Sequence, residues 1–278
     1  MTAAGGADTG RGGSGRWEPE RTGDGSWTLR HPDHGDTCHS RAGAWQEARE
    51  RYALPCRLRE RARGPFLRQR FYLLDVGTGL GLNLAAALEA LEDTGVELSA
   101  VGLELDPGVL HAALRLPVGA SDDPWRPWWQ CVRDGLRQAL DDPVRAGAPA
   151  GLELETPGGG RWRLRLVADD ARRAVRRLEP QVGFDAVFLD PFAPATEPDL
   201  WDTRFLADVA ARMRPGSWLS TYSAALSVRA ALVRAGLRVG PGPRVGTKAE
   251  GTLASPDRDP GAFDPRVERR LQRRLSRS

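Results

Sequence analysis

The glycine-rich stretch at residues 71–83, Phe-Tyr-Leu-Leu-Asp-Val-Gly-Thr-Gly-Leu-Gly-Leu-Asn, constrains the fold of this chain more than any other feature. It begins with an apolar run typical of a central parallel strand, and apolar residues after position 81 continue it as a helix. Gly77, Gly79 and Gly81 lie at the turn between them. Because glycine has no Cβ, this turn can bring backbone N–H groups and the helix N-terminus against a nucleotide-like ligand. The stretch therefore predicts an α/β fold.

The glycine spacing indicates which ligand is favoured. A dinucleotide fingerprint would have its third glycine at position 82, where the chain has leucine, so S-adenosylmethionine is favoured over NAD or FAD. A glycine turn can also be purely structural. A second apolar strand, over residues 98–104, strengthens the ligand interpretation because it ends on Glu104, about 20 residues past the turn, where doubly wound folds hold a ribose with an acid. We therefore predict that Glu104 accepts hydrogen bonds from ribose hydroxyls.

Two later strands also end on acids. A hairpin over residues 152–166 leads to Asp169 and Asp170, either of which can accept a hydrogen bond from an adenine amino group; we favour Asp170. A buried strand over residues 184–190 ends on Asp190, followed by Pro-Phe-Ala-Pro, which resembles the Asp-Pro-Pro-Tyr loop of amine-directed methyltransferases. An uncharged amine that attacks a sulfonium methyl needs alignment and an acceptor for its hydrogens, and Asp190 can be that acceptor.

The remaining pattern completes an α/β alternation. We predict a helix over residues 199–213 that Gly216 stops, a strand over residues 217–222, and an antiparallel strand near residues 252–255. Together these elements predict the class I methyltransferase fold, a Rossmann-like, mostly parallel seven-stranded sheet with helices on both faces.

The chain of 278 residues suits one sizeable domain with additions. Residues 1–25 are rich in Gly, Thr, Asp and Arg and lack the apolar core of a signal peptide, which predicts a disordered tail. Residues 26–66 are expected to form a substrate-side extension with a helix at 44–52. The methyltransferase domain is assigned to residues 67–256, with an insertion at about 117–160, and the basic C-terminal tail to residues 257–278.

Several classes of protein are disfavoured by the composition. No apolar run approaches the ~20 residues that span a bilayer, so we expect no membrane segment and a cytoplasmic protein. Cys38, Cys56 and Cys131 are odd in number and widely spaced. This argues against a disulfide framework and against a zinc site, and we expect no metal.

The chain resembles the methyltransferase domain of the MnmC family, the tRNA 5-methylaminomethyl-2-thiouridine biosynthesis proteins, over about residues 36–256. The resemblance rests on residues 75–83, on Glu104 with Pro107, on Asp170-Ala, and above all on two long blocks, residues 189–201 and 220–229. Pro191, where the bifunctional enzymes have Gly, and the long insertion after residue 117 depart from the family pattern. No second glycine fingerprint for an FAD-dependent oxidase is present, so we expect a stand-alone form.

The resemblance implies transfer of a methyl group from S-adenosyl-L-methionine to the aminomethyl group of wobble uridine, 5-aminomethyl-2-thiouridine, in tRNA. A separate enzyme would supply that amine. Implied cofactor contacts are Asp75, Gly77, Gly79, Gly81, Asn83, Glu104, Asp169 and Asp170; Asp190 would face the amine, and Phe192, Tyr222, Arg229 and Lys248 would contact substrate.

Two alternatives remain open. One is a methyltransferase, or a related aminopropyltransferase, for a small-molecule amine, and an exposed basic surface near Asp190 would count against it. The other is a non-catalytic binding protein on the same fold, which would not need Glu104, Asp170 and Asp190 at strand ends.

The C-terminal tail contains a candidate helix. Asp264 suits the N-cap and Pro265 the first helical position, and arginines recur from Arg266 to Arg277 at three- and four-residue steps beside a narrow apolar stripe. Arginine abundance alone is a weak indication, because a GC-rich genome also enriches it, so distribution is more informative. The stripe predicts contact with a phosphate backbone; a frayed, solvated tail is the alternative.

Overall fold

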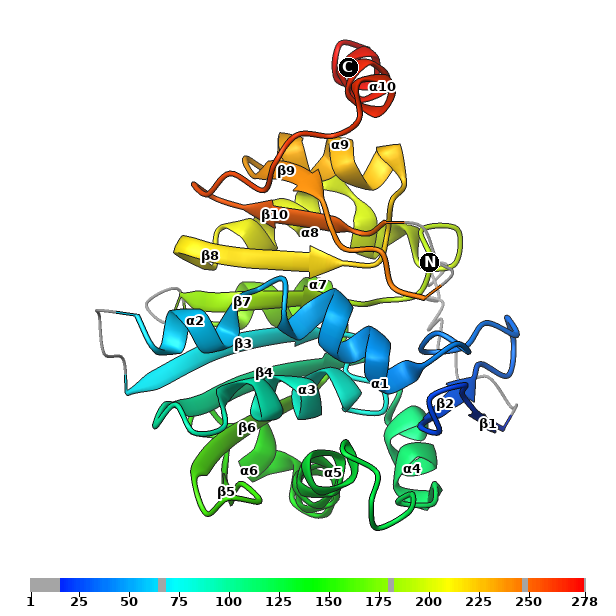
Figure 1. The fold of residues 1–278 in the computed structure, drawn as a ribbon, viewed down its shortest axis with the longest axis vertical. Helices are drawn as coiled ribbons and strands as arrows, with labels where there is room; N and C mark the ends of the chain where they lie inside the picture. The colour runs from blue at the N-terminus through cyan, green and yellow to red at the C-terminus, as the bar shows by residue number, and fades with distance from the viewer. Residues whose placement is uncertain (1–15, 65–68, 180–182, 247–249, 278) are drawn as a thin grey trace, which may run out of the picture.

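A single mixed sheet forms the centre of the computed structural model, which describes residues 16–64, 69–179, 183–246 and 250–277. The sheet has eight strands in the order β5-β6-β4-β3-β7-β8-β10-β9 (Figure 1). Five neighbouring strands are parallel: β6 (Arg161–Ala168), β4 (Glu97–Glu104), β3 (Arg70–Val76), β7 (Phe184–Leu189) and β8 (Met213–Thr221). Antiparallel strands complete both edges: β5 (Leu152–Glu155) on one side, β10 (Thr252–Ser255) and β9 (Arg238–Pro241) on the other.

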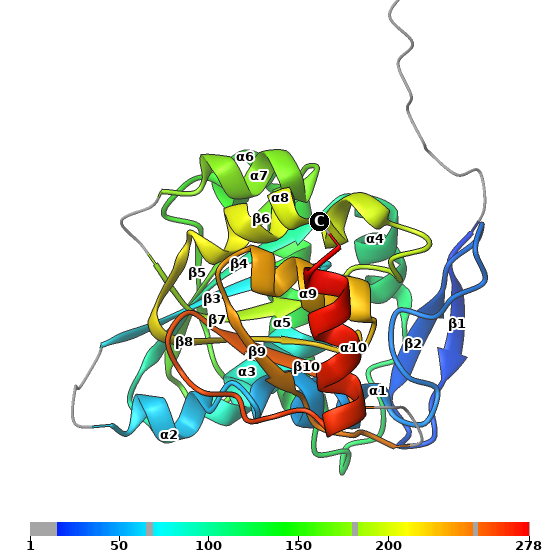
Figure 2. The ribbon, with the colours of Figure 1, turned by 90° about the horizontal axis from the view of Figure 1, so that it is seen from above.

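Helices cover both faces of the sheet, because its central strands are apolar on both sides. On β3, Leu73 packs into the core under one helical layer and Leu74 into the core under the other, and both are fully buried. Figure 2 shows α2 and α3 on one side of the sheet and α7 and α8 on the opposite side. The first layer comprises α1 (Ala44–Glu47), the π-helix η1 (Ala48–Ala53), α2 (Leu58–Ala62), α3 (Leu82–Leu91) and α5 (Arg126–Asp141); the second comprises α7 (Ala171–Arg177), α8 (Thr203–Ala210) and α9 (Leu226–Arg234).

Further elements lie at the margins of these two layers. Their bounds are α4 (Pro107–Arg115), α6 (Pro143–Gly147), the 3-10 helix η2 (Pro198–Trp201), α10 (Pro265–Leu275), and a separate hairpin of β1 (Glu18–Arg21) and β2 (Trp27–Arg30). The hairpin is tied to the domain by the Trp17 indole, which donates to the Asp106 carboxylate at 2.9 Å. None of the helices described is long and apolar enough to cross a membrane.

The predicted fold class is confirmed, with one strand more than the seven expected, because the hairpin adds β5 at the edge. Two predictions are wrong. Residues 16–25 were assigned to a disordered tail, yet they form β1 and its turn, with Trp17 buried at 7% exposure. The helix predicted over residues 199–213 ends at Ala210, and Gly216 lies inside β8 instead of stopping a helix. Pairing of Met213 with Phe184 on β7 outweighs the helical periodicity there.

Candidate active site

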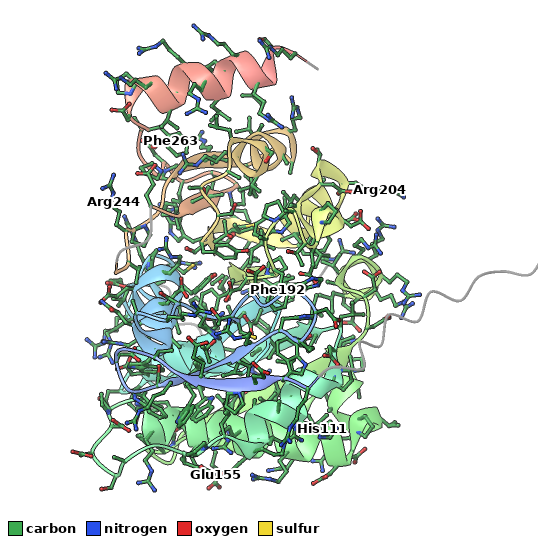
Figure 3. The ribbon with its side chains drawn as sticks, turned by 90° about the vertical axis from the view of Figure 1, so that its right-hand side faces the viewer. His111, Glu155, Phe192, Arg204, Arg244 and Phe263 are labelled. Atoms are coloured by element: carbon green, nitrogen blue, oxygen red, sulfur yellow. The ribbon has the colours of Figure 1, made fainter. Side chains whose placement is uncertain are left out.

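The candidate site lies where the carboxyl ends of β3, β4 and β7 meet, as expected for an open parallel sheet. The glycine turn follows β3, Glu104 ends β4, and Asp190 follows β7. Figure 3 looks onto this side of the molecule, with Phe192 near its centre. Residues from separate segments of the sequence are therefore brought to one edge of the sheet.

The three glycines of the turn differ in what surrounds them. All three have positive φ, +82° at Gly77, +50° at Gly79 and +76° at Gly81, a region that L side chains rarely adopt. A Cβ at Gly77 would lie 2.7 Å from the Asp190 carbonyl oxygen, so this glycine lets the two loops touch. A Cβ at Gly79 would meet nothing nearer than the Gly77 oxygen at 3.9 Å. Gly79 is itself buried, but the room on its Cβ side would let a ligand approach the backbone.

Glu104 is connected directly to that turn. Its Oε2 accepts from the Gly79 N–H at 2.8 Å, and its Oε1 accepts from the Asp106 N–H at 3.0 Å. Burial raises the pKa of the Glu104 carboxyl to about 7, against the lowering effect of these two backbone hydrogen bonds. The carboxyl therefore titrates near neutral pH and is placed beside the glycine turn, as a ribose-binding acid should be.

Asp190 is held by two side chains from different elements. Its Oδ1 accepts a short hydrogen bond from the Tyr52 hydroxyl on η1, and its Oδ2 accepts from the Asn83 amide on α3 at 2.9 Å. Burial and the neighbouring Asp190 charge raise the pKa of the Tyr52 phenol well above its ordinary value, so Tyr52 stays a donor. These contacts fix the direction in which the carboxylate points.

Two buried polar groups beside the turn fit a polar ligand. Both carboxylate oxygens of Asp75 and the Oδ1 of Asn83 are buried and make no hydrogen bond of normal geometry in the described part of the chain. Burial, followed by the charge of Asp190, raises the pKa of Asp75 well above its ordinary range, with the Thr78 hydroxyl opposing the shift. Buried acceptors without donors are costly. With the open side of Gly79 and the Glu104 carboxyl, they fit S-adenosylmethionine, whose ammonium and ribose hydroxyls are donors.

An aromatic group lies close to Asp190 in the sequence. The half-buried Phe192 ring stacks on Trp17 with centroids 6.2 Å apart and meets His31 edge-on at 5.2 Å. The Phe192 backbone is held in turn, since its N–H donates to Glu197 and its carbonyl accepts from the Trp201 indole at 2.7 Å. We refer to Trp17, His31 and Phe192 as the aromatic wall. Tyr222 lies nearby, donating to the Pro191 carbonyl at 2.9 Å.

The prediction made for Arg229 is wrong. Predicted as a substrate contact, it is 2% exposed, pairs with Glu250 at 3.1 Å and donates to Thr252 and to the Gly251 carbonyl. Its guanidinium is therefore occupied in joining α9 to β10. Lys248, the other predicted cation, lies outside the described residues.

The choice between Asp169 and Asp170 for adenine stays a prediction. Asp170 caps α7 by accepting from the Arg172 N–H at 2.8 Å, and its carboxylate also binds the Arg172 guanidinium. Asp169 pairs with Arg173 and Arg177. Both acids thus have protein partners near the end of β6.

Three residues near the site were not predicted from the sequence. Tyr52 is in a segment predicted only as a helix, and Trp17 is in the assigned tail. The third is Cys38. Burial, and then the charges of Glu104 and Asp190, raise the pKa of its thiol well above the ordinary value. Since each reaches the site through tertiary packing, no local motif identifies them. Among the described residues no group of three or more His, Cys, Asp or Glu is arranged to hold a metal.

The fold and the arrangement of this site define a class I S-adenosylmethionine-dependent methyltransferase. Residues 145–257 match the family model described as S-adenosyl-L-methionine-dependent methyltransferase. The crystal structure of MnmC2 from Aquifex aeolicus is similar with a TM-score of 0.73 and 30% identity, covering 96% of this chain and 78% of that one. The chain belongs to the family of MnmC-like S-adenosyl-L-methionine-dependent methyltransferase domains.

Curated relatives agree with this assignment. The bifunctional tRNA 5-methylaminomethyl-2-thiouridine biosynthesis protein MnmC of Azoarcus sp. is 32% identical over 228 residues, which is 78% of this chain and 32% of that protein. The chain thus spans about a third of the length of this bifunctional relative. An uncharacterized protein of Methanocaldococcus jannaschii is 27% identical, over 84% of this chain and 58% of its own.

The titration of Glu104 predicts a pH dependence of cofactor binding. Ribose hydroxyls donate to the charged carboxylate, so binding should lower a pKa that is about 7 in the free protein. Binding then releases a proton below about pH 7, and affinity should rise from about pH 5.5 to 7.5, by at most about tenfold per pH unit. Calorimetry in two buffers of different ionisation enthalpy measures that proton. In the Glu104→Gln variant the cofactor affinity should no longer depend on pH. An equal slope of affinity against pH in both proteins would contradict the role of Glu104 as the ribose acid.

Proposed function

We propose that the protein transfers the methyl group of S-adenosyl-L-methionine to the amine of 5-aminomethyl-2-thiouridine at the wobble position of tRNA. The observation that carries this proposal is the Asp190 carboxylate, held by Tyr52 and Asn83 next to the glycine turn and beside the aromatic wall. The function for which the MnmC relatives are named supports the choice of substrate.

The cofactor and Asp190 have separate roles in the methyl transfer. The cofactor, when bound, supplies an activated methyl group on its sulfonium. Asp190 accepts a hydrogen bond from the attacking amine and so directs its lone pair. An ionised carboxylate has about four acceptor positions, which is why one group can bind Tyr52 and Asn83 and also an amine hydrogen. Catalysis then comes mainly from alignment, since a displacement between positioned partners needs little further help.

The aromatic wall suits a flipped base better than a small aliphatic amine. Aromatic side chains bind single-stranded bases by stacking, worth about 1–3 kcal/mol per base. Burial, and then the neighbouring His34, lower the pKa of His31, so the His31 ring is neutral at physiological pH. A neutral ring beside Phe192 adds a flat surface for a base without adding a positive charge next to the amine.

The direct test is to incubate the purified protein with S-adenosylmethionine carrying a labelled methyl group and tRNA bearing the wobble aminomethyl group, followed by nucleoside analysis. Label in the methylaminomethyl nucleoside is expected. The same tRNA lacking the aminomethyl group is the control and should stay unlabelled. Label transferred to free diamines but not to tRNA would favour the small-amine alternative.

Replacing Phe192 with alanine should raise KM for tRNA about tenfold, because the substrate base then has one ring fewer on which to stack. Cofactor affinity should stay within about twofold, since the ring lies on the substrate side. Phe192→Tyr is the matched control and should keep most of the affinity. Steady-state kinetics with varied tRNA, together with cofactor calorimetry, measures both, and an unchanged KM in the alanine variant would remove the aromatic wall from substrate binding.

A further inference from the structure

The C-terminal helix α10 is docked on the domain through its apolar stripe. Leu271 is 3% exposed and forms a core cluster with Phe263 and Ala230, against which Val267 and Leu275 also pack. Asp264 caps the helix by accepting from the Arg266 N–H at 2.8 Å. At the other end the Arg234 guanidinium of α9 donates to the Arg274 carbonyl at 3.0 Å. The helix is therefore a packed element of the fold, which argues against a frayed tail.

The opposite side of α10 presents a row of guanidinium groups to solvent. Its exposed arginines are Arg266, Arg269, Arg270, Arg273 and Arg274, and Arg277 follows the last turn. The helix has one acid, Glu268, whose carboxylate accepts from Gln272 at 3.0 Å. In the part of the chain that the structure describes, no ion pair joins these arginines to a carboxylate. Arg234 and Arg238, on α9 and β9, extend the exposed positive surface.

Helix α7 provides an internal comparison, because it is also rich in arginine, with four in its seven residues against five in the eleven of α10. There, each guanidinium is paired: Arg172 with Asp170 and Asp199, Arg173 and Arg177 with Asp169, and Arg176 with Asp208. Compositional bias alone would enrich arginine in both helices and does not explain why only one set is neutralised. The charge of α10 is therefore available to a partner outside the chain.

We propose that α10 binds the phosphate backbone of tRNA, away from the wobble base that enters the active site. This inference rests on the proposed tRNA substrate. Arginine makes bidentate contacts with phosphate, and the row from Arg266 to Arg274 extends about 12 Å at 1.5 Å per residue. A membrane surface fits less well, because the apolar stripe that would insert into lipid is buried against α9 and Phe263.

The position of α10 suits a large substrate. In Figure 3 the helix lies along the top of the side that presents Phe192. The arginine side chains of α10 are exposed. It is at the β9 edge of the sheet, opposite the edge formed by β5 (Figure 1). A ligand that contacts both α10 and the candidate site must be extended, as a nucleic acid is and a small amine is not.

The test compares two variants of the full chain with the same loss of charge. In the first, Arg269, Arg270, Arg273 and Arg274 are changed to glutamine, which keeps helix propensity. In the control, four exposed arginines on other elements are changed to glutamine: Arg115 on α4, Arg137 on α5, Arg145 on α6 and Arg161 on β6. Two of them, Arg137 and Arg161, are ion-paired with Asp134 and Glu153. Circular dichroism and thermal melting establish that both are folded. Kd for tRNA is measured from about 50 to 200 mM salt, a range over which phosphate contacts weaken steeply.

We expect the α10 variant to bind tRNA at least about tenfold more weakly at low salt, with a log–log salt slope smaller by about 0.7–0.9 for each phosphate that the variant no longer neutralises. The control variant should match the unmodified protein, and the cofactor Kd should change in neither. Equal Kd values and slopes for both variants would overturn the proposal. So would weaker binding of the α10 variant to anionic phospholipid vesicles with unchanged binding to tRNA.

The test of tRNA binding is independent of the proposed methyl-transfer reaction. Binding is measured with tRNA that lacks the aminomethyl group, so it does not depend on methyl transfer. If the α10 variant lowers the salt slope but the protein methylates no tRNA, the phosphate contact is upheld and the proposed reaction is overturned. If the protein methylates tRNA but the α10 variant binds it normally, the proposed reaction is upheld and the phosphate contact is overturned.

Discussion

Replacing Asp190 with alanine is expected to lower turnover by about a hundredfold, because the attacking amine loses the hydrogen-bond acceptor that aligns it, while the cofactor Kd changes by less than about threefold. The reason is that the proposed function gives Asp190 the amine, and gives the cofactor to the glycine turn and Glu104, which is hydrogen-bonded to Gly79. The alanine variant also leaves the Tyr52 hydroxyl and the Asn83 amide without this acceptor in a buried site. Single-turnover rates and cofactor calorimetry separate the two quantities.

Two conservative variants sharpen this prediction. Asp190→Asn should retain part of the activity, since an amide oxygen still accepts one hydrogen bond. Tyr52→Phe removes a positioning hydrogen bond without touching the substrate, so it should lower kcat less than Asp190→Ala and leave KM for tRNA nearly unchanged. Full turnover by the alanine variant on tRNA bearing the amine would exclude Asp190 from catalysis.

Replacing Glu104 with alanine should weaken cofactor binding by about tenfold to a hundredfold, because hydrogen bonds to a charged acceptor contribute about 1.5–3 kcal/mol. The variant lacks the ribose acceptor and also the partner of the Gly79 and Asp106 N–H groups. The glycine turn should loosen, and the melting temperature should fall by a few degrees, since the Gly79 N–H is shielded from water and a buried donor left without a partner costs about 1–3 kcal/mol.

Glu104→Gln separates these two effects. Glutamine can still accept one of the two backbone hydrogen bonds, so it should restore most of the thermal stability but only part of the affinity. Calorimetry and thermal melting on the three proteins measure both. Unchanged affinity in Glu104→Ala would refute its role as the ribose acid, whatever the stability.

The sequence predicted the fold well because its signals are local. The strand, turn and helix at residues 71–91, and the apolar runs that became β4 and β7, are each recognisable from a few consecutive residues. The helix predicted to run to residue 213 failed for the opposite reason. Its periodicity is helical, but the register of β8 against β7 places Met213 in the sheet.

The candidate site was predicted in part. Glu104 and Asp190 lie at strand ends, where a parallel sheet places ligand-binding residues, so topology implied their meeting. A motif does not predict what its side chains contact. Arg229 lies in a block that resembles the family, and yet it is buried against Glu250 and Thr252. Whether an arginine faces a substrate or its own protein depends on neighbours that are distant in the sequence.

The sequence by itself determined the class of fold, the end of the sheet that binds ligands, and the acids at that end, because strand periodicity, glycine turns and strand ends are properties of short segments. Only the tertiary structure decided that Tyr52 and Trp17, separated from Asp190 and Phe192 by more than a hundred residues, contact them, and that α10 is docked with its arginines outward while those of α7 are paired. Such contacts depend on how packed layers bring remote segments together, and no short segment encodes them.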